Sequence, residues 1–340
     1  MNITKNCFIL SFVLLLCLPA AAQESNSWIE LINPELFGVA TGEKDNWTYK
    51  SNCLVGTTEA APTIIRTTTQ FGQYNITVRY ALSGAAKASL LLKTDPAGKR
   101  CLEIPLKASE KGIAELNLTA QQISAQTKLG RGFIGIKLYE GSICVYSLNL
   151  QPENMKPLFN GKDLTGWKKY DVVDAAVNEK GEMTVQNGNG ALESADSFAD
   201  FELSLDVFVN GDDLNSGVFF RCIPGEKMNG YECQVHFGYL DGDRTKPQDC
   251  GTGGIFRRVN ARKVLGDNKT WNRIYINAVG NHIAVWVNGV QVTDWSDTRK
   301  PNPNPRKGLR TEAGTIQLQA HDPTTNLLFR NIRAGAVPVR

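Results

Sequence analysis

The sequence predicts an all-β protein built as two successive antiparallel β-sandwiches. Three observations lead to this fold class. Nearly every periodic stretch alternates apolar and polar residues with a period of two, which is typical of half-buried strands. Gly, Asn, Asp and Pro interrupt these stretches at short intervals, as turn residues do. A polar segment that contains two prolines, residues 151–157, separates one strand-rich block from the next.

The first residues predict export. An apolar run at residues 8–18 follows Lys5 and ends in the small residues Ala20, Ala21 and Ala22. This order is typical of a secretory signal peptide that is cleaved after Ala22. The run is shorter than the ~20 residues that a membrane-spanning helix needs, and no comparable run follows. We therefore expect a signal peptide at residues 1–22 and a periplasmic or extracellular mature chain without a membrane span.

The remaining chain divides into two predicted domains. We place a smaller accessory β-sandwich at residues 24–152 and the main sandwich at residues 153–340. Strands are expected, in chain order, at residues 74–80, 201–209, 217–222, 231–237, 274–279, 283–287 and 316–320. A short helix is expected at residues 120–126. The dipeptide Asn288-Gly289 predicts a hairpin turn before a strand at 290–292, because both residues tolerate positive φ.

Charge and cysteine content narrow the function. A net charge of +3 without a basic block argues against nucleic acid as a partner and favours neutral substrates. Six cysteines follow the signal peptide, three in each predicted domain: Cys53, Cys101, Cys144, Cys222, Cys233 and Cys250. In an oxidising compartment we expect at most one disulfide in each domain and a leftover thiol. No CxxC spacing indicates zinc.

A series of short motifs runs in order through the second domain. It begins with LFNGKDLTGW at residues 158–167. The motifs that follow are FEL at 201–203, NSGVFFR at 215–221, GYECQV at 230–235, TGGI at 252–255, WN at 271–272, VWVNG at 285–289, IQLQAH at 316–321 and FRNI at 329–332. Together they resemble the 3-keto-disaccharide hydrolase domain family over about residues 157–335. The resemblance implies a concanavalin A-like or LamG-like jelly roll with one concave sheet, and an enzyme that acts on glycosidic bonds.

Alternation places a set of polar side chains on one face of three predicted strands. Residues two apart in a strand share a face. The residues assigned to the polar face in this way are Arg221, Glu232, Gln234, His236, Gln319 and His321. An antiparallel sheet ordinarily has one solvated face, so this pattern is also typical of a sheet without a site. Because most of these residues fall in motifs of the family, we expect them to meet around one pocket on the concave sheet.

The chemistry that the resemblance implies gives each residue a role. A ketone at C3 of a sugar acidifies the hydrogen at C2, so the bond at C1 can break by elimination, followed by addition of water. This route needs a base, an acid and a group that stabilises the enolate oxygen. We assign Glu232 and His321 as base and acid, in either order, and Arg221 as the enolate stabiliser. The residues expected to bind substrate are Gln234, Gln319, Asn215, His236 and Arg257.

Arg257 is included because the family motif departs from its pattern after Thr252-Gly253-Gly254. Two adjacent arginines, Arg257 and Arg258, stand where the family tends to have small or aliphatic residues. Guanidinium groups bind carboxylates and stack on flat surfaces, so this loop is a candidate selector of an acidic or aromatic aglycone. A solvated strand end is the alternative.

Three other functions remain open. An adhesion or structural protein would have polar sheet faces and no pocket. A non-catalytic carbohydrate-binding sandwich would use the same concave sheet. A glycosidase with two carboxylates needs a partner for Glu232, which would have to come from a loop, for example from Asp241 or Asp243. These two acids, with Asp212 and Asp213, could instead bind calcium, although their spacing fits no EF-hand. No metal ligand is assigned, and the cofactor stays unknown.

Overall fold

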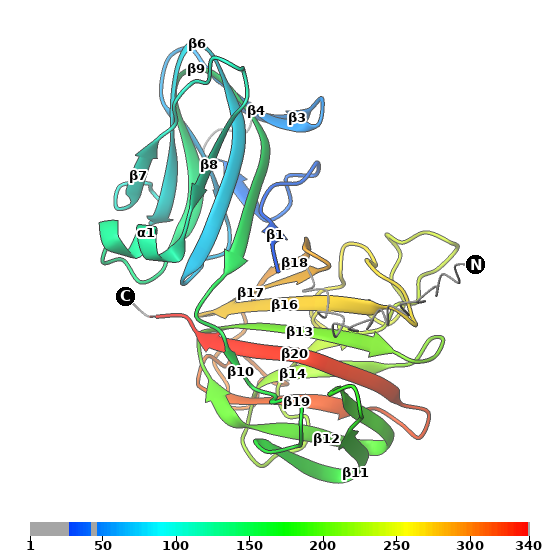
Figure 1. Cartoon of the computed structure of the whole chain (residues 1–340). Coiled ribbons are helices and arrows are strands. Elements are labelled where there is room, and N and C mark those ends of the chain that lie inside the picture. The colour runs from blue at the N-terminus through cyan, green and yellow to red at the C-terminus, as the bar shows by residue number, and fades with distance from the viewer. Residues whose placement is uncertain (1–26, 42–45, 339–340) are drawn as a thin grey trace, which may run out of the picture.

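The computed structural model describes residues 27–41 and 46–338 (Figure 1). The predicted signal peptide at residues 1–22 lies outside the described residues. The first sheet contains nine strands in the described part of the chain. They are β1 Ile29–Glu30, β2 Val39–Thr41, β3 Trp47–Lys50, β4 Cys53–Thr58, β5 Thr63–Thr67, β6 Tyr74–Thr94, β7 Leu102–Pro105, β8 Ala114–Leu118 and β9 Phe133–Pro152. Among the residues described, no helix is long and apolar enough to cross a membrane.

Two long strands organise this N-terminal sandwich. β6 and β9 pair antiparallel along most of their length, and bulges between Arg79 and Tyr80 and between Ser83 and Lys87 change their register. β9 also pairs with β1, β4 and β5. A disulfide between Cys53 and Cys144 joins β4 to β9.

The predicted helix is α1, Ala120–Gln126. It begins with a capping box, in which the Thr119 hydroxyl accepts from the Gln122 amide and the Gln122 side chain accepts from the Thr119 amide.

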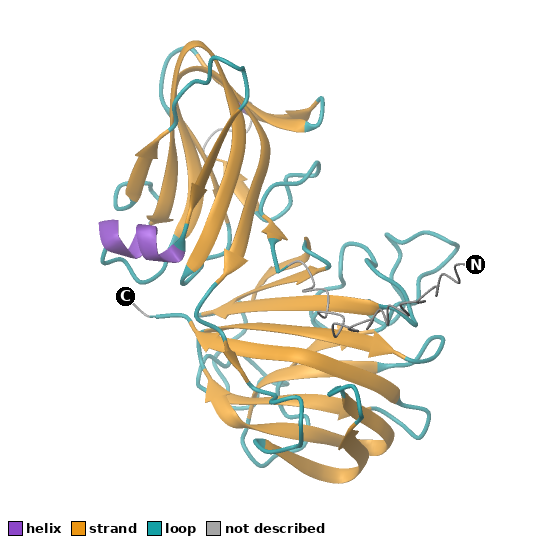
Figure 2. Ribbon diagram, in the orientation of Figure 1, coloured by secondary structure: helices purple, strands orange, loops and turns teal. Residues whose placement is uncertain are grey.

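The C-terminal sheet has eleven strands and curls into the second sandwich (Figure 2). Its strands are β10 Lys156–Pro157, β11 Trp167–Val177, β12 Met183–Phe198, β13 Phe201–Val209, β14 Ser216–Cys222, β15 Tyr231–Val235, β16 Trp271–Val279, β17 His282–Val287, β18 Val290–Ser296, β19 Gly314–Ala320 and β20 Asn326–Ala336. Their main order is β15-β14-β19-β12-β20-β13-β16-β17-β18. Because β12 pairs with β20 at one end and β19 at the other, it connects the two layers.

The prediction of two all-β sandwiches is confirmed, and so are its local elements. The turn at Asn288-Gly289 has φ of 50° and 85° and joins β17 to β18 in antiparallel register. The inward side chains that alternation predicts in β15 and β19, such as Cys233 and Leu318, lie in the core of the second sandwich. β15 ends at Val235, two residues earlier than expected, where the His236 amide donates to the Thr252 hydroxyl instead.

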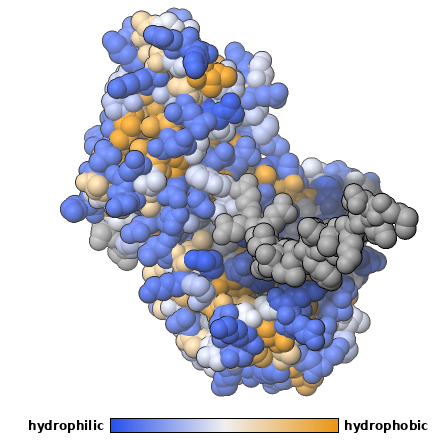
Figure 3. Space-filling model, viewed as in Figure 1, coloured by the Kyte–Doolittle hydropathy of each residue, from blue (hydrophilic) through white to orange (hydrophobic). Residues whose placement is uncertain are grey.

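The two sandwiches share an apolar contact. Tyr275, Ala284 and Trp286 point from β16 and β17 into the hydrophobic core of the N-terminal sandwich. Trp286 is 1 % exposed, and its Nε1 donates to the Glu30 carbonyl over 3.1 Å. The N-terminal sandwich therefore stands on the side of the C-terminal sheet formed by β16, β17 and β18 (Figure 1), while hydrophilic residues cover most of the outer surface seen in Figure 3.

Candidate functional site

The candidate site lies on the face of β15, β14 and β19 that points away from the core. On this face Glu232 stands opposite Phe219, which in turn stands opposite Gln317. In the next row Gln234 stands opposite Gly217. The side chains on this face are buried, and residues from the connecting loops contact them: the Met228 amide donates to Gln317 Oε1, and Arg306 donates to Glu232 Oε2. The strands thus place a layer of amides and one carboxylate beneath a cover of loops.

Glu232 is the central ionisable group. Its side chain extends over Gly217, where a Cβ atom would lie 2.9 Å from both its Cγ and its Oε1. The absent side chain at position 217 leaves the space that the carboxylate occupies. Burial raises the pKa of Glu232 to about 7, and the charge of Asp249 adds to this shift, whereas Arg306 and His321 oppose it. A carboxyl group with this pKa can take up or release a proton at neutral pH.

Arg306 is the cation that faces Glu232, and the sequence reading did not identify it. Its Nη2 donates to Glu232 Oε2 over 3.3 Å and to the Met228 carbonyl over 3.2 Å. Its guanidinium carbon lies 5.1 Å from the centre of the Phe219 ring. The side chain is 38 % exposed, so it lies at the boundary between the buried layer and solvent. It belongs to the loop of residues 297–313 between β18 and β19, which we call the Arg306 loop.

Gln234 belongs to an amide network that ends on a second carboxylate. Its Nε2 donates to Asn215 Oδ1 over 3.0 Å and to Asp249 Oδ2 over 2.9 Å, and Asn215 also donates to Asp249. Because a carboxylate only accepts, Asp249 fixes the orientation of both amides. The Oε1 atoms of Gln234 and Gln319 have no hydrogen-bond partner among the described residues.

The histidines lie at the ends of two strands. His321 follows β19, is 40 % exposed, and its Nδ1 lies 2.7 Å from Asp322 Oδ2. Hydrogen bonds from Thr324 and His321 lower the pKa of Asp322 to about 2. Asp322 therefore stays ionised, and His321 acts electrostatically on Glu232. His236 is buried, and its Nδ1 accepts a hydrogen bond from the Gly238 amide over 3.1 Å, so this ring is held by the backbone two residues further along the chain.

The expectation that Arg221 faces the site is wrong. Arg221 has φ of +48° and lies where the pairing of β14 with β19 shifts register. This bulge breaks the alternation and buries the guanidinium completely. There it donates to the carbonyls of Ala199, Gly280 and Arg310 over 2.8, 2.8 and 3.2 Å. Arg221 holds backbone segments together instead of facing the polar layer.

The arginines at 257 and 258 have different surroundings. Arg257 is exposed, and its guanidinium carbon lies 5.1 Å from the centre of the Phe256 ring. The Phe256 amide donates to the Glu232 carbonyl over 2.9 Å, so this stack lies next to β15. Arg258 donates to the Arg306 carbonyl over 2.8 Å and thus helps to hold the Arg306 loop.

Loop acids considered for calcium form ion pairs and hydrogen bonds with nearby side chains and amides. Asp212 pairs with Lys269 at 3.0 Å, and Asp241 pairs with Lys246 at 3.1 Å. Asp243 accepts from the Thr245 amide and hydroxyl. Within residues 27–41 and 46–338, no group of three or more His, Cys, Asp and Glu residues is arranged to hold a metal ion. The acid whose charge acts on Glu232 is Asp249, which the sequence pattern did not single out.

Comparisons with known proteins give one family match and several similar solved structures. A family model described as the 3-keto-alpha-glucoside-1,2-lyase-like domain matches residues 154–334. A solved structure of a candidate glycosyl hydrolase from Parabacteroides distasonis is 25 % identical, covers 54 % of this chain and 100 % of its own, and has a TM-score of 0.44. The carbohydrate-binding module CBM66 from Bacillus subtilis is 17 % identical over 51 % of this chain and 98 % of its own, with a TM-score of 0.38. No curated protein matches the chain in sequence.

Proposed function

Because the chain belongs to the 3-keto-alpha-glucoside-1,2-lyase-like family through residues 154–334, we propose that it cleaves 3-keto-glycosides or related disaccharides beside Glu232. Membership supports a glycoside hydrolase-like or carbohydrate-binding role in general. The observation that carries the specific proposal is the pairing of Glu232, a buried carboxyl group with a pKa near neutrality, with the cation of Arg306.

The reaction is an elimination. A base removes the hydrogen at C2, and the electrons of that bond form a C1–C2 double bond by way of an enolate whose negative charge rests on the C3 oxygen. The bond between C1 and the glycosidic oxygen breaks, and the leaving oxygen takes a proton. Addition of water across the new double bond would complete a net hydrolysis.

Glu232 is the base in this proposal. A carboxylate with a pKa of about 7 is a stronger base than an ordinary glutamate, yet about half of it is ionised at neutral pH. Because loops cover the site face, an enolate formed there would be shielded from water, and electrostatic contacts with it would be strong.

Arg306 replaces Arg221 as the group that stabilises the enolate. Its guanidinium lies against Glu232 and is 38 % exposed, so it can also approach a ligand that enters from solvent. A fixed cation beside a developing oxyanion lowers the barrier because it needs no rearrangement during the reaction. His321, held by the ionised Asp322, is the proposed donor of the proton to the leaving oxygen.

The amides provide recognition of the sugar. The Oε1 atoms of Gln234 and Gln319 are buried acceptors without a partner among the described residues, and hydroxyl groups of a sugar are suitable donors. Asn215 supports Gln234 through Asp249 and is proposed to contact substrate only from the edge. We also propose that Arg257, stacked on Phe256 at the surface, contacts the aglycone.

The Cys53–Cys144 disulfide supports the proposal that the protein works outside the cytoplasm, where such bonds persist. The test of the function is to incubate the purified protein with a disaccharide and with its 3-oxidised form, and to follow release of the two sugars. A carbohydrate-binding protein without activity, the second candidate, would bind one of these sugars and release nothing.

A further inference from the structure

The contacts of Arg221 and Asp200 suggest what the N-terminal sandwich does for the site. We propose that Asp200 and Arg221 are positioning residues that connect the N-terminal sandwich, through Arg131, to the Arg306 loop. The inference rests on the proposed function only in taking Arg306 to act on the substrate. It follows from hydrogen bonds and ion pairs that join three separate parts of the chain.

The first connection crosses between the sandwiches. Arg131, which lies just before β9, pairs with Asp200 in the turn between β12 and β13. The side chains are 17 % and 15 % exposed, so the pair is largely shielded from water. An ion pair with this degree of burial is screened less than one on the surface, and loss of one partner leaves a charge that is poorly hydrated.

The second connection runs from Asp200 into the C-terminal sandwich. Asp200 Oδ1 accepts from the Gly280 amide over 2.8 Å and from Arg221 Nη2 over 3.4 Å. Arg221 is completely buried, and burial lowers the pKa of its guanidinium, whereas the charge of Asp200 opposes this shift. A buried cation keeps its position only while its charge is compensated. Asp200 is the carboxylate that compensates it.

The third connection reaches the Arg306 loop. Arg221 Nη1 donates to the Arg310 carbonyl over 3.2 Å. The Arg310 amide in turn donates to the Tyr231 hydroxyl over 3.0 Å, and this hydroxyl donates to Asp297 over 2.7 Å. Tyr231 and Glu232 are neighbours on β15. The loop that carries Arg306 is therefore fixed to the strand that carries Glu232, with Arg221 as one of the anchors.

Other contacts hold the same loop, so the expected effect is partial. Arg299 donates to the carbonyls of Pro305 and Gly308, and Arg258 donates to the Arg306 carbonyl. Removal of the charge at Asp200 should displace Arg306 without unfolding the loop. The groups that act on the charge of Glu232 are Arg306, Asp249 and His321, and Arg306 is the one attached to this loop.

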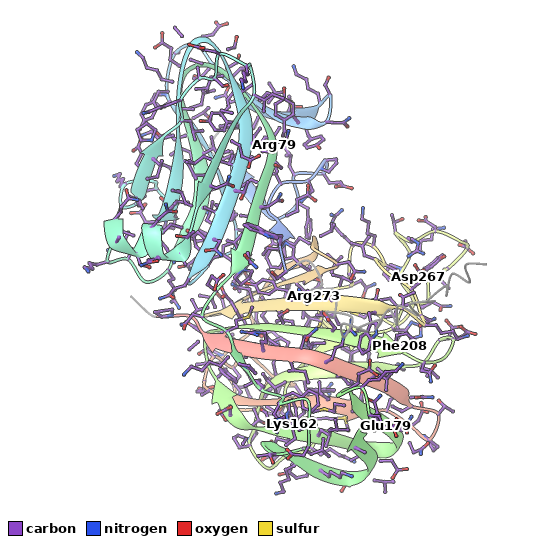
Figure 4. The ribbon with its side chains drawn as sticks, viewed as in Figure 1. Arg79, Lys162, Glu179, Phe208, Asp267 and Arg273 are labelled. Carbon is purple, nitrogen blue, oxygen red and sulfur yellow. A yellow bond between two sulfur atoms is a disulfide. The ribbon has the colours of Figure 1, made fainter. Side chains whose placement is uncertain are left out.

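The test compares three variants of the full chain with the wild type. Asp200→Asn keeps an acceptor for the Gly280 amide but removes the charge that both arginines use. Arg131→Gln removes only the ion pair between the N-terminal sandwich and Asp200, and Arg131→Lys should restore this pair. The control is Arg79→Gln, because Arg79 forms an exposed pair with Glu115 on the N-terminal sandwich, away from the C-terminal sandwich (Figure 4).

Two readouts are needed. The first is the kinetics on a 3-keto-glycoside. We expect kcat to fall by roughly 2-fold to 30-fold in Asp200→Asn, less in Arg131→Gln, and not in Arg131→Lys or Arg79→Gln. KM should change little, since the amides that bind hydroxyls are untouched. The second is the pKa of Glu232 from carboxyl ¹³C shifts of glutamate-labelled protein, with Glu232→Gln used to assign the signal. It should rise in the same order, because Glu232 loses attraction to Arg306.

The second readout does not depend on catalysis. If the wild type releases no sugar but the pKa of Glu232 rises in Asp200→Asn and Arg131→Gln, the proposed function fails and the positioning role stands. If both variants only lower the melting temperature, and kcat and the pKa of Glu232 match the wild type, the positioning role is overturned. Arg131→Gln remains informative if Asp200→Asn does not fold, because Arg131 is partly exposed.

Discussion

Arg306 Nη2 lies 3.3 Å from Glu232 Oε2, and this contact joins a cation on a loop to a buried carboxyl group on a strand. The two residues are 74 positions apart in the sequence. Because the pair combines a base of nearly neutral pKa with a cation that reaches solvent, it is the part of the molecule on which the proposed elimination depends.

Glu232→Gln should lower kcat on a 3-keto-glycoside by about 10²-fold to 10⁴-fold, the usual effect of losing one acid or base. The amide has nearly the same size, so the fold should persist. Thermal unfolding checks this point. A variant that is folded and retains full activity would exclude Glu232 as the base.

The pH dependence follows from the raised pKa. Glu232 must be ionised to act as a base, so kcat/KM should fall about tenfold per pH unit well below pH 7 and level off above it. The stability of the folded state depends on pH in the opposite direction. The folded-state pKa lies above the ordinary glutamate value of 4.5, so Glu232 favours the folded state at low pH, and this contribution is lost as the pH rises through about 7.

Denaturant titrations of the wild type and Glu232→Gln at pH 5 and pH 8 check this linkage. Between pH 5 and pH 8 the free energy of unfolding of the glutamine variant should rise relative to that of the wild type, by no more than about 3 kcal/mol. An unchanged difference between the two pH values would contradict the raised pKa.

Arg306→Met should keep the contact with Phe219 and remove the charge. We expect kcat to fall by about 10²-fold to 10³-fold, as when a donor to a developing oxyanion is removed. The acidic limb of the pH profile should also move to higher pH, because Glu232 loses its attraction to the cation. Arg306→Lys retains the charge and should be impaired less. Equal activity of the methionine variant and the wild type would exclude Arg306 as the stabilising group.

Gly217→Ala tests the space that Glu232 occupies. The new Cβ would lie 2.9 Å from Cγ and Oε1 of Glu232 and 3.1 Å from the Phe219 ring, so the carboxylate must move. Gly217 does not have a positive φ, and alanine should therefore fit the backbone. We expect a large loss of kcat with a small change in melting temperature. Gly72→Ala is the matched control, because its nearest neighbours lie 3.6 Å away or more. Full activity of Gly217→Ala would contradict the geometry described.

The parts of the site that the sequence predicts are those that follow strand periodicity. Alternation places Glu232, Gln234 and Gln319 on one face, and their strands are regular at those positions. Alternation assigns Arg221 to the wrong face, because a bulge changes the side on which the following side chains lie and is not visible in a period-two pattern. Arg306 and Asp249 lie on loops, where position depends on contacts with distant segments. The proline-rich run at residues 301–305 was the one local sign that the chain before Arg306 is stiff.

The measurement that tests the central claim most directly is a paired assay of the purified protein on a disaccharide and on the same disaccharide oxidised at C3. The proposal predicts release of the two sugar units from the oxidised substrate alone, and loss of that release in Glu232→Gln. Cleavage of both substrates at similar rates would contradict the elimination, because the unoxidised sugar has no ketone to acidify C2. Binding of either sugar without release would contradict the assignment as an enzyme.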